Sequence, residues 1–146
     1  MTSDPEAVVR RLFELFNALP ADPGERAQSE ALRELLALFD PQVEFRQLRD
    51  QPDLRSLQGR DAFSESWGEW LNAWQSHRSE IGELQVRGDR VLVFSRDRLV
   101  GREAMQVDTR GSIIFTVEDG KIIRMQTFGE DHDAAWQGFE ELPQAE

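Results

Sequence analysis

The first part of the chain has its apolar residues at helical spacing. Val9, Leu12, Phe13 and Phe16 fall on one face of a helix, and residues 3–6 supply a capping box with a proline in the first turn. We therefore expect a helix over about residues 4–18. The breakers between residues 20 and 24 end it, and a second apolar stripe over residues 32–39 predicts another helix that ends before Asp40.

A third stripe is largely aromatic. Phe63, Trp67, Trp70, Leu71 and Trp74 recur at three- and four-residue steps after Gly59. This spacing predicts a helix up to about residue 74. More often such a stripe is core than ligand-binding surface, although its members can do both.

Elsewhere the apolar residues alternate. Residues 43–47 predict a short strand, followed by a loop over about residues 49–58. From residue 81 onward the period is two, with turn signals near residues 88, 101 and 119, which predicts strands at about 80–87, 90–100, 105–117 and 121–129. A last helix is expected over about residues 131–141, docked by Trp136 and Phe139.

This order of elements predicts an α+β fold with helices gathered on one face of a curved, mostly antiparallel sheet. The 146 residues suit one domain, 1–146, with one core. A curled sheet with helices across its mouth encloses a cavity.

Several phrases in this order resemble the SnoaL-like family of the nuclear transport factor 2-like superfamily. They are FDPQVEF at 39–45, QGRDAFSESWGEWLNAW at 58–74, GDRVLVFSRDR at 88–98 and MQVDTRGSIIFTVEDGKIIRM at 105–125. The resemblance implies a cone-shaped roll with an internal pocket for a small organic ligand, no cofactor requirement, and a homodimer packed through the outer sheet faces. Its relatives include ketosteroid isomerases, polyketide cyclases and limonene epoxide hydrolases.

The catalytic positions of two relatives are not filled in this chain. Where the resemblance would place the base and the oxyanion donor of a ketosteroid isomerase, the chain has Gln47 and Ile113. Where it would place the arginine and the two aspartates of a limonene-type epoxide hydrolase, the chain has Arg96, Arg98 and Thr127. Neither activity is therefore expected.

Composition narrows the function further. A net charge of −11 makes nucleic acids and anionic membranes unlikely partners, and the lack of cysteine removes disulfides and thiolate chemistry. The start of the chain has no signal-peptide pattern, and no run approaches the roughly 18 apolar residues of a membrane helix. We expect a cytoplasmic protein.

The strand at 90–100 can be read in two phases. Leu92 and Phe94 share a face with Arg96 and Arg98, whereas Val91 and Val93 share the other face with Asp97. The resemblance points the two arginines inward, where a guanidinium needs an anion and would bind an anionic ligand. The alternatives are an internal salt bridge or a solvent-exposed rim position. A slip of one residue would turn Asp97 or Asp108 inward as the base instead.

The remaining site predictions follow from the faces. His132 is a candidate acid or base if it folds over the pocket mouth, and a helix cap otherwise. No histidine sits at a metal-binding spacing, so no metal site is expected. The predicted ligand-binding residues come from the inner faces and the aromatic stripe: Phe45, Gln47, Trp70, Trp74, Phe94, Thr109, Ile113, Phe115, Met125 and Thr127.

Two functions remain open. One is a pocket protein that acts on an organic substrate by cofactor-independent acid–base or electrostatic catalysis, as an isomerase, cyclase or hydratase. The other is a non-catalytic binding or dimerisation module that has lost the catalytic carboxylates of its relatives. A pocket filled by its own aromatic side chains would favour the module.

Overall fold

The computed structural model describes residues 4–47, 57–103 and 105–141 of the chain. Its elements follow the order α1 Pro5–Ala18, α2 Pro23–Ala27, α3 Glu30–Ala37, β1 Phe39–Gln47, β2 Leu57–Gln58, α4 Arg60–Leu71, β3 Trp74–Arg87, β4 Arg90–Gly101, β5 Gln106–Glu118, β6 Lys121–Thr127 and α5 His132–Glu141. The predicted α+β class is confirmed. Most of the loop expected over residues 49–58 lies outside the described residues.

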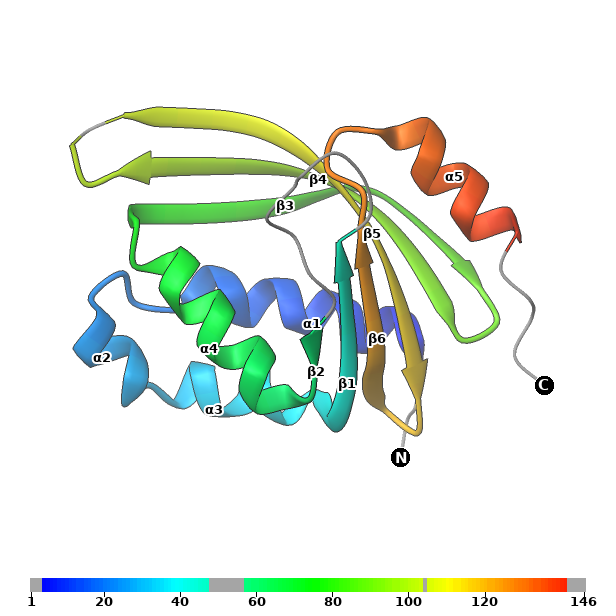
Figure 1. Ribbon diagram of the computed structural model, residues 1–146, viewed down its shortest axis with the longest axis horizontal. Coiled ribbons are helices and arrows are strands. Elements are labelled where there is room, and N and C mark those ends of the chain that lie inside the picture. The colour runs from blue at the N-terminus through cyan, green and yellow to red at the C-terminus, as the bar shows by residue number, and fades with distance from the viewer. Residues whose placement is uncertain (1–3, 48–56, 104, 142–146) are drawn as a thin grey trace.

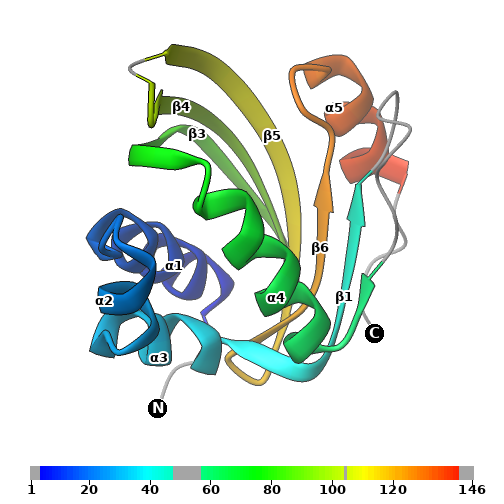
Figure 2. The ribbon, with the colours of Figure 1, turned by 60° about the vertical axis from the view of Figure 1, so that its left-hand side comes forward.

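The strands form one curved sheet in the order β2-β1-β6-β5-β4-β3. The neighbouring strands are antiparallel except β1 and β6, which run parallel. Figure 2 shows how β3, β4 and β5 curl over the first four helices. This curvature gives the sheet a concave face, which the helices cover, and a convex face.

The helices divide unequally between the two faces. Helices α1 to α4 lie on the concave side, whereas α5 lies across the outside of the sheet (Figures 1 and 2). The main hydrophobic core joins α1 and α3 to the concave face through residues such as Val9, Leu35 and Phe115. A smaller cluster joins α5 to the convex face through Leu92, Phe94, Ile114, Phe128, Ala135 and Phe139. The sheet is therefore covered on both sides over the first half of β4 and the second half of β5.

Local sequence signals explain the helix starts. Asp4 caps α1 by accepting a hydrogen bond from the backbone N–H of Glu6 at 3.1 Å, and Pro5 occupies the first turn. Asp22 and Ser29 cap α2 and α3 in the same way. Helix α4 begins after Gly59, whose φ of +98° suits a residue without a side chain.

Several details differ from the sequence predictions, among them β2 within the expected loop and α5 on the convex face rather than with the other helices (Figure 2). Helix α2 was not expected, because five residues between breakers are too short to show a helical period. The aromatic stripe suggested that the third helix runs to Trp74, but α4 ends at Leu71 and Trp74 opens β3.

Candidate functional site

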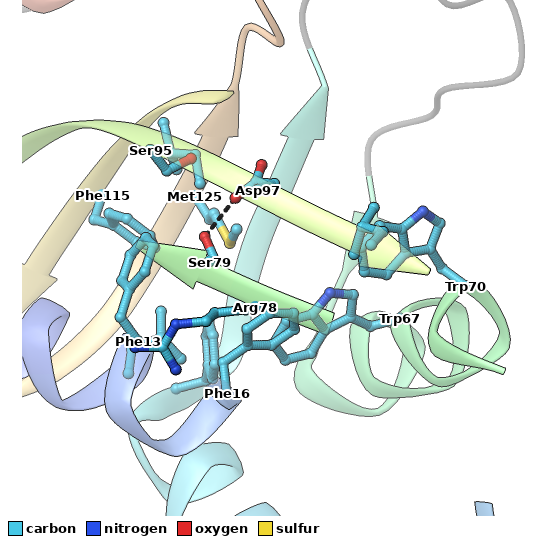
Figure 3. Close-up of a pocket in the computed structure, with 14 residues that line it drawn as sticks. Phe13, Phe16, Trp67, Trp70, Arg78, Ser79, Ser95, Asp97, Phe115 and Met125 are labelled. Atoms are coloured by element: carbon cyan, nitrogen blue, oxygen red, sulfur yellow. Dashed lines mark hydrogen bonds between the residues drawn. The ribbon is translucent and has the colours of Figure 1, made fainter. Parts of the chain in front are cut away.

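A cavity of about 140 Å³ lies between the concave face of the sheet and helices α1 and α4. Most of its wall is apolar and largely aromatic: Leu12, Phe13, Phe16, Phe39, Trp67, Trp70, Leu99, Ile113, Phe115 and Met125. Four polar residues complete it: Arg78 and Ser79 on β3, and Ser95 and Asp97 on β4. Figure 3 shows these polar side chains gathered beside the aromatic rings.

Asp97 is the one carboxylate among the described residues that line the cavity. It lies on β4, next to the edge strand, opposite Ser79 on β3 and Thr109 on β5. The Ser79 hydroxyl donates a hydrogen bond of 2.5 Å to Oδ1 of Asp97. Burial raises the pKa of the Asp97 carboxyl, and the hydroxyls of Ser79 and Ser95 oppose that rise. A carboxyl in this state can exchange a proton closer to neutral pH than an ordinary aspartate.

Helix α1 fixes the position of Ser79. The side chain of Asn17 accepts a hydrogen bond from the Ser79 backbone N–H and donates one to the Ser79 carbonyl, both at 2.8 Å. Two residues earlier on β3, Nε2 of His77 lies 2.8 Å from the Phe16 carbonyl oxygen. Burial lowers the pKa of His77. These contacts hold α1 against the free edge of β3 and so set one wall of the cavity.

The aromatic wall is made of paired rings. Phe16 and Trp67 stack with ring centroids 5.2 Å apart, and Phe13 meets Phe115 edge-on at 6.4 Å. Trp70 lines the cavity and is 43% exposed, so the cavity reaches the surface beside it. Such walls favour a flat, apolar ligand body.

The predicted inward orientation of Arg96 and Arg98 is wrong. Both side chains are exposed on the convex face. Arg96 donates two hydrogen bonds to Asp108, of 3.2 Å and 2.9 Å, and both side chains of this pair are 55% exposed. The outward phase avoids the cost of burying two guanidinium groups. The alternative phase, with Val91, Val93 and Asp97 inward, is the one that the structure adopts.

His132 and Phe94 also lie on the convex side. Their rings are 4.5 Å apart, and Phe94 belongs to the cluster under α5. The predicted placement of Phe94 inside the pocket is therefore wrong, and of the two alternatives for His132 the position over the pocket mouth is not adopted. Asp131 rather than His132 caps α5, because its carboxylate accepts a hydrogen bond from the Ala134 N–H at 3.0 Å.

The other predicted ligand-binding residues divide into two groups. Trp70, Ile113, Phe115 and Met125 lie on the cavity wall. The remainder do not line it among the described side chains: Phe45 packs on Phe63, Trp74 meets Trp70 edge-on, Thr109 donates to Glu130, and Thr127 pairs with Ile113 across the sheet. The side chain of Gln47 lies outside the described part of the chain. A role in binding stays a prediction for the first group.

Sequence reasoning missed the polar pair Ser79 and Ser95 and the α1 residues Phe13 and Phe16 as cavity residues. An alternating serine has no periodic signal of its own. The α1 rings were visible as an apolar helix face, but the pattern of a helix does not say whether that face fills a core or lines a cavity.

The sequence pattern of the SnoaL-like domain matches residues 9–125 of the chain. The chain belongs to the SnoaL-like domain family. This confirms the resemblance of the sequence, and similar solved structures show that the SnoaL-like domain has the nuclear transport factor 2-like fold. No curated protein sequence matches the chain.

Three similar structures illustrate that fold. An NTF2-like protein of unknown function from Exiguobacterium sp. 255-15 is 21% identical, covers 85% of this chain and 98% of its own, and has a TM-score of 0.68. A putative SnoaL-like polyketide cyclase from Jannaschia sp. CCS1 is 19% identical over 95% of this chain and 93% of its own, with a TM-score of 0.67. TerC, co-crystallised with polyporic acid, is 18% identical, covers 94% of this chain and 98% of its own, and has a TM-score of 0.67.

Two other kinds of site are absent from the described residues. They contain no group of three or more His, Cys, Asp or Glu side chains arranged to hold a metal ion. Within the same ranges, no helix combines the length and apolar character required to span a membrane.

Proposed function

We propose that this SnoaL-like domain binds a small, flat organic molecule in its concave cavity and transfers a proton on it with Asp97 as acid or base. The reaction needs no cofactor and belongs to the isomerisation, cyclisation or hydration class. The observation that carries the proposal is the position of Asp97, the one carboxylate among the described residues that line a mostly apolar cavity. A general acid or base is most effective when its pKa lies near the working pH.

The orientation of Asp97 supports this role. Ser79 holds Oδ1 in one direction, and Ser79 is itself fixed by Asn17. A carboxylate held by neighbours that do not move keeps its reacting oxygen in place, which lowers the cost of reaching the transition state. The co-crystallisation of the similar protein TerC with polyporic acid supports a small organic ligand for this fold.

The structure gives no support to the expected anionic ligand. That expectation rested on Arg96, which is paired with Asp108 on the other face of the sheet. An anion in the cavity would meet the like charge of Asp97 instead. Arg78 lines the cavity, but its Nε lies 3.5 Å from the Glu80 carboxylate. A neutral ligand fits these charges better.

A non-catalytic binding module remains the second candidate. The cavity of about 140 Å³ is smaller than the roughly 300–1,000 Å³ of most ligand sites. In addition, Gln47, Ile113 and Thr127 stand where the sequence resemblance would place catalytic groups. A cavity of this size can hold one small ligand but is too small to enclose a polycyclic substrate.

A base-catalysed elimination tests the proposal without knowledge of the substrate. A carboxylate base opens 5-nitrobenzisoxazole by removing its carbon-bound proton while the N–O bond breaks, and the released phenolate is coloured. We expect turnover that rises with pH through the raised pKa of Asp97, because the base must be ionised. Asp97→Asn should lower the rate at least about tenfold.

Asp108→Asn is the matched control, since it removes a carboxylate from the neighbouring strand on the outer face. Equal rates for the unaltered chain and Asp97→Asn would contradict the role of Asp97 as a base. Binding of the compound in the cavity without any turnover would support the non-catalytic module.

Homodimerisation and a cytoplasmic location also remain proposals. Strand alternation would place Ile114 and Ile122 on an exposed outer face that a second copy could cover, but both are fully buried. Ile114 lies under α5 and Ile122 belongs to the main core. The family resemblance is the remaining support for a dimer. Sedimentation at micromolar concentration that shows only a 16.8 kDa species would contradict it.

A further inference from the structure

Ser95 carries a buried hydroxyl that lies near the Asp97 carboxylate but meets the geometry of a full hydrogen bond with no described residue. The residue is 5% exposed and lines the cavity, yet its Oγ makes no hydrogen bond of acceptable geometry within the described residues. A buried hydroxyl without a partner destabilises a protein, and native structures rarely leave one without a reason. A polar atom of a bound ligand would supply the missing partner.

Gly111 on β5 lets Ser95 and Asp97 converge. Gly111 lies directly opposite Ser95 in the sheet. A Cβ at this position would lie 2.7 Å from Oγ of Ser95 and 3.1 Å from Oδ2 of Asp97. Both oxygens therefore lie over the same point of β5, in space that any other residue would fill. A glycine inside a regular strand often marks such a close approach.

The two oxygens of Asp97 have different surroundings. Oδ1 accepts the hydrogen bond from Ser79, whereas Oδ2 is the oxygen that lies beside Gly111 and Ser95. Ser95 Oγ and Asp97 Oδ2 together offer one hydroxyl donor and one carboxylate acceptor. We call these two oxygens and Gly111 the Ser95–Asp97 niche.

A hydroxyl group uses both members of this niche at once. Its oxygen accepts a hydrogen bond from Ser95, and its O–H donates to Oδ2 of Asp97. A carboxylate repels Asp97, and a hydrocarbon satisfies neither group; an ammonium ion can donate to both oxygens but offers the Ser95 O–H no acceptor. A ligand hydroxyl is therefore the group that uses the Ser95 donor and the Asp97 acceptor together.

The cavity walls define the rest of the ligand. Phe13, Phe16, Trp67 and Phe115 present rings to the cavity, and its volume of about 140 Å³ is close to that of an engineered apolar cavity of roughly 150 Å³ that binds benzene. We propose that the ligand is a single-ring phenol whose oxygen lies between Ser95 and Asp97. This inference rests on the proposed function, because it names the group with which Asp97 exchanges a proton.

Titrations with phenol, anisole and toluene, followed by protein NMR, test the proposal in the unaltered chain. An apolar cavity prefers toluene to phenol, because a phenol must give up its hydration. We expect the reverse here, with phenol bound at least about tenfold more tightly than toluene or anisole. Binding of toluene or anisole as tight as that of phenol would overturn the niche and leave the cavity intact. Failure of all three to bind would instead overturn the proposed function.

Two variants separate the niche from the walls. Ser95→Ala should weaken phenol binding by about tenfold and leave toluene binding unchanged. Gly111→Ala should also weaken phenol binding, because its Cβ displaces the Ser95 hydroxyl. Ser112→Ala is the matched control. Ser112 is a buried serine that follows Gly111 on β5, and its hydroxyl donates a hydrogen bond to the Gly129 carbonyl on the opposite face of the sheet. An equal loss of phenol binding in Ser112→Ala would overturn the assignment to Ser95.

Discussion

The Ser79 hydroxyl on the edge strand β3 donates a 2.5 Å hydrogen bond to the Asp97 carboxylate on the inner strand β4. The two residues lie directly opposite each other in the sheet. Since Asn17 on α1 binds both backbone polar groups of Ser79, a continuous chain of hydrogen bonds runs from the first helix to the cavity carboxylate. The position of Asp97 therefore depends on a residue that does not touch the cavity.

Asn17→Ala should destabilise the protein by about 1 to 3 kcal/mol. The change leaves the N–H and the C=O of Ser79 without their side-chain partner, and a partly buried polar group without a partner costs this much. Urea denaturation measures the change. A loss below about 0.5 kcal/mol for Asn17→Ala would show that the anchor contributes little.

Asp97→Asn should stabilise the protein at neutral pH by about 0.5 to 2 kcal/mol, the usual gain where a functional site carries strain. Because the folded-state pKa of Asp97 is raised above its unfolded value, its contribution to stability is fully present at low pH and is lost as pH rises through the folded pKa. The advantage of Asn should therefore shrink as the pH falls through the raised folded-state pKa of Asp97, and be smallest below the ordinary range of an aspartate. Thermal unfolding across pH tests this, and an advantage that grows on acidification would contradict it.

Arg96→Met should leave phenol binding and the elimination rate unchanged. The guanidinium lies on the convex face, in an exposed ion pair with Asp108, and such pairs contribute little to stability. The melting temperature should also stay close to that of the unaltered chain. A loss of ligand affinity in Arg96→Met with no loss of fold would show that this arginine faces the cavity after all.

Chelators should change neither the stability nor any activity of the protein. The described residues contain no cluster of metal-binding side chains, and the chain has no cysteine. Thermal unfolding with and without EDTA provides the measurement. A clear drop in melting temperature with EDTA, reversed by an added divalent ion, would contradict the expectation.

Periodicity was sufficient for most of the fold and failed where both faces of an element are covered. The cap at Asp4 and the apolar face of α1 located the first helix. Along β4, by contrast, every residue from Arg90 to Ser95 is buried, because the main core covers one side and α5 the other. Alternation then carries no information about which face is inner. The phase that decides between Arg96 and Asp97 was therefore not determined by the strand itself.

The site depended on contacts that are distant in the sequence. Asn17 and Ser79 are separated by 62 residues, and Gly111 has meaning only beside Ser95. No local pattern predicts such a pair. The exposed pair of Arg96 and Asp108 likewise joins two strands, and the sequence prediction turned Arg96 to the wrong face.

The position of α5 divides the hydrophobic interior into two parts of unequal size. The main core joins three helices to the sheet, whereas the small cluster depends on α5 and on a few residues of β4, β5 and the segment after β6. A unit with few buried contacts can open without global unfolding. The backbone amides of α5 should exchange with deuterated solvent before those of α1, and the detached helix would uncover Phe94 and Ile114. In the native ensemble, this outer surface would then be transiently exposed and able to bind other apolar surfaces, while the cavity on the opposite side of the sheet keeps its walls.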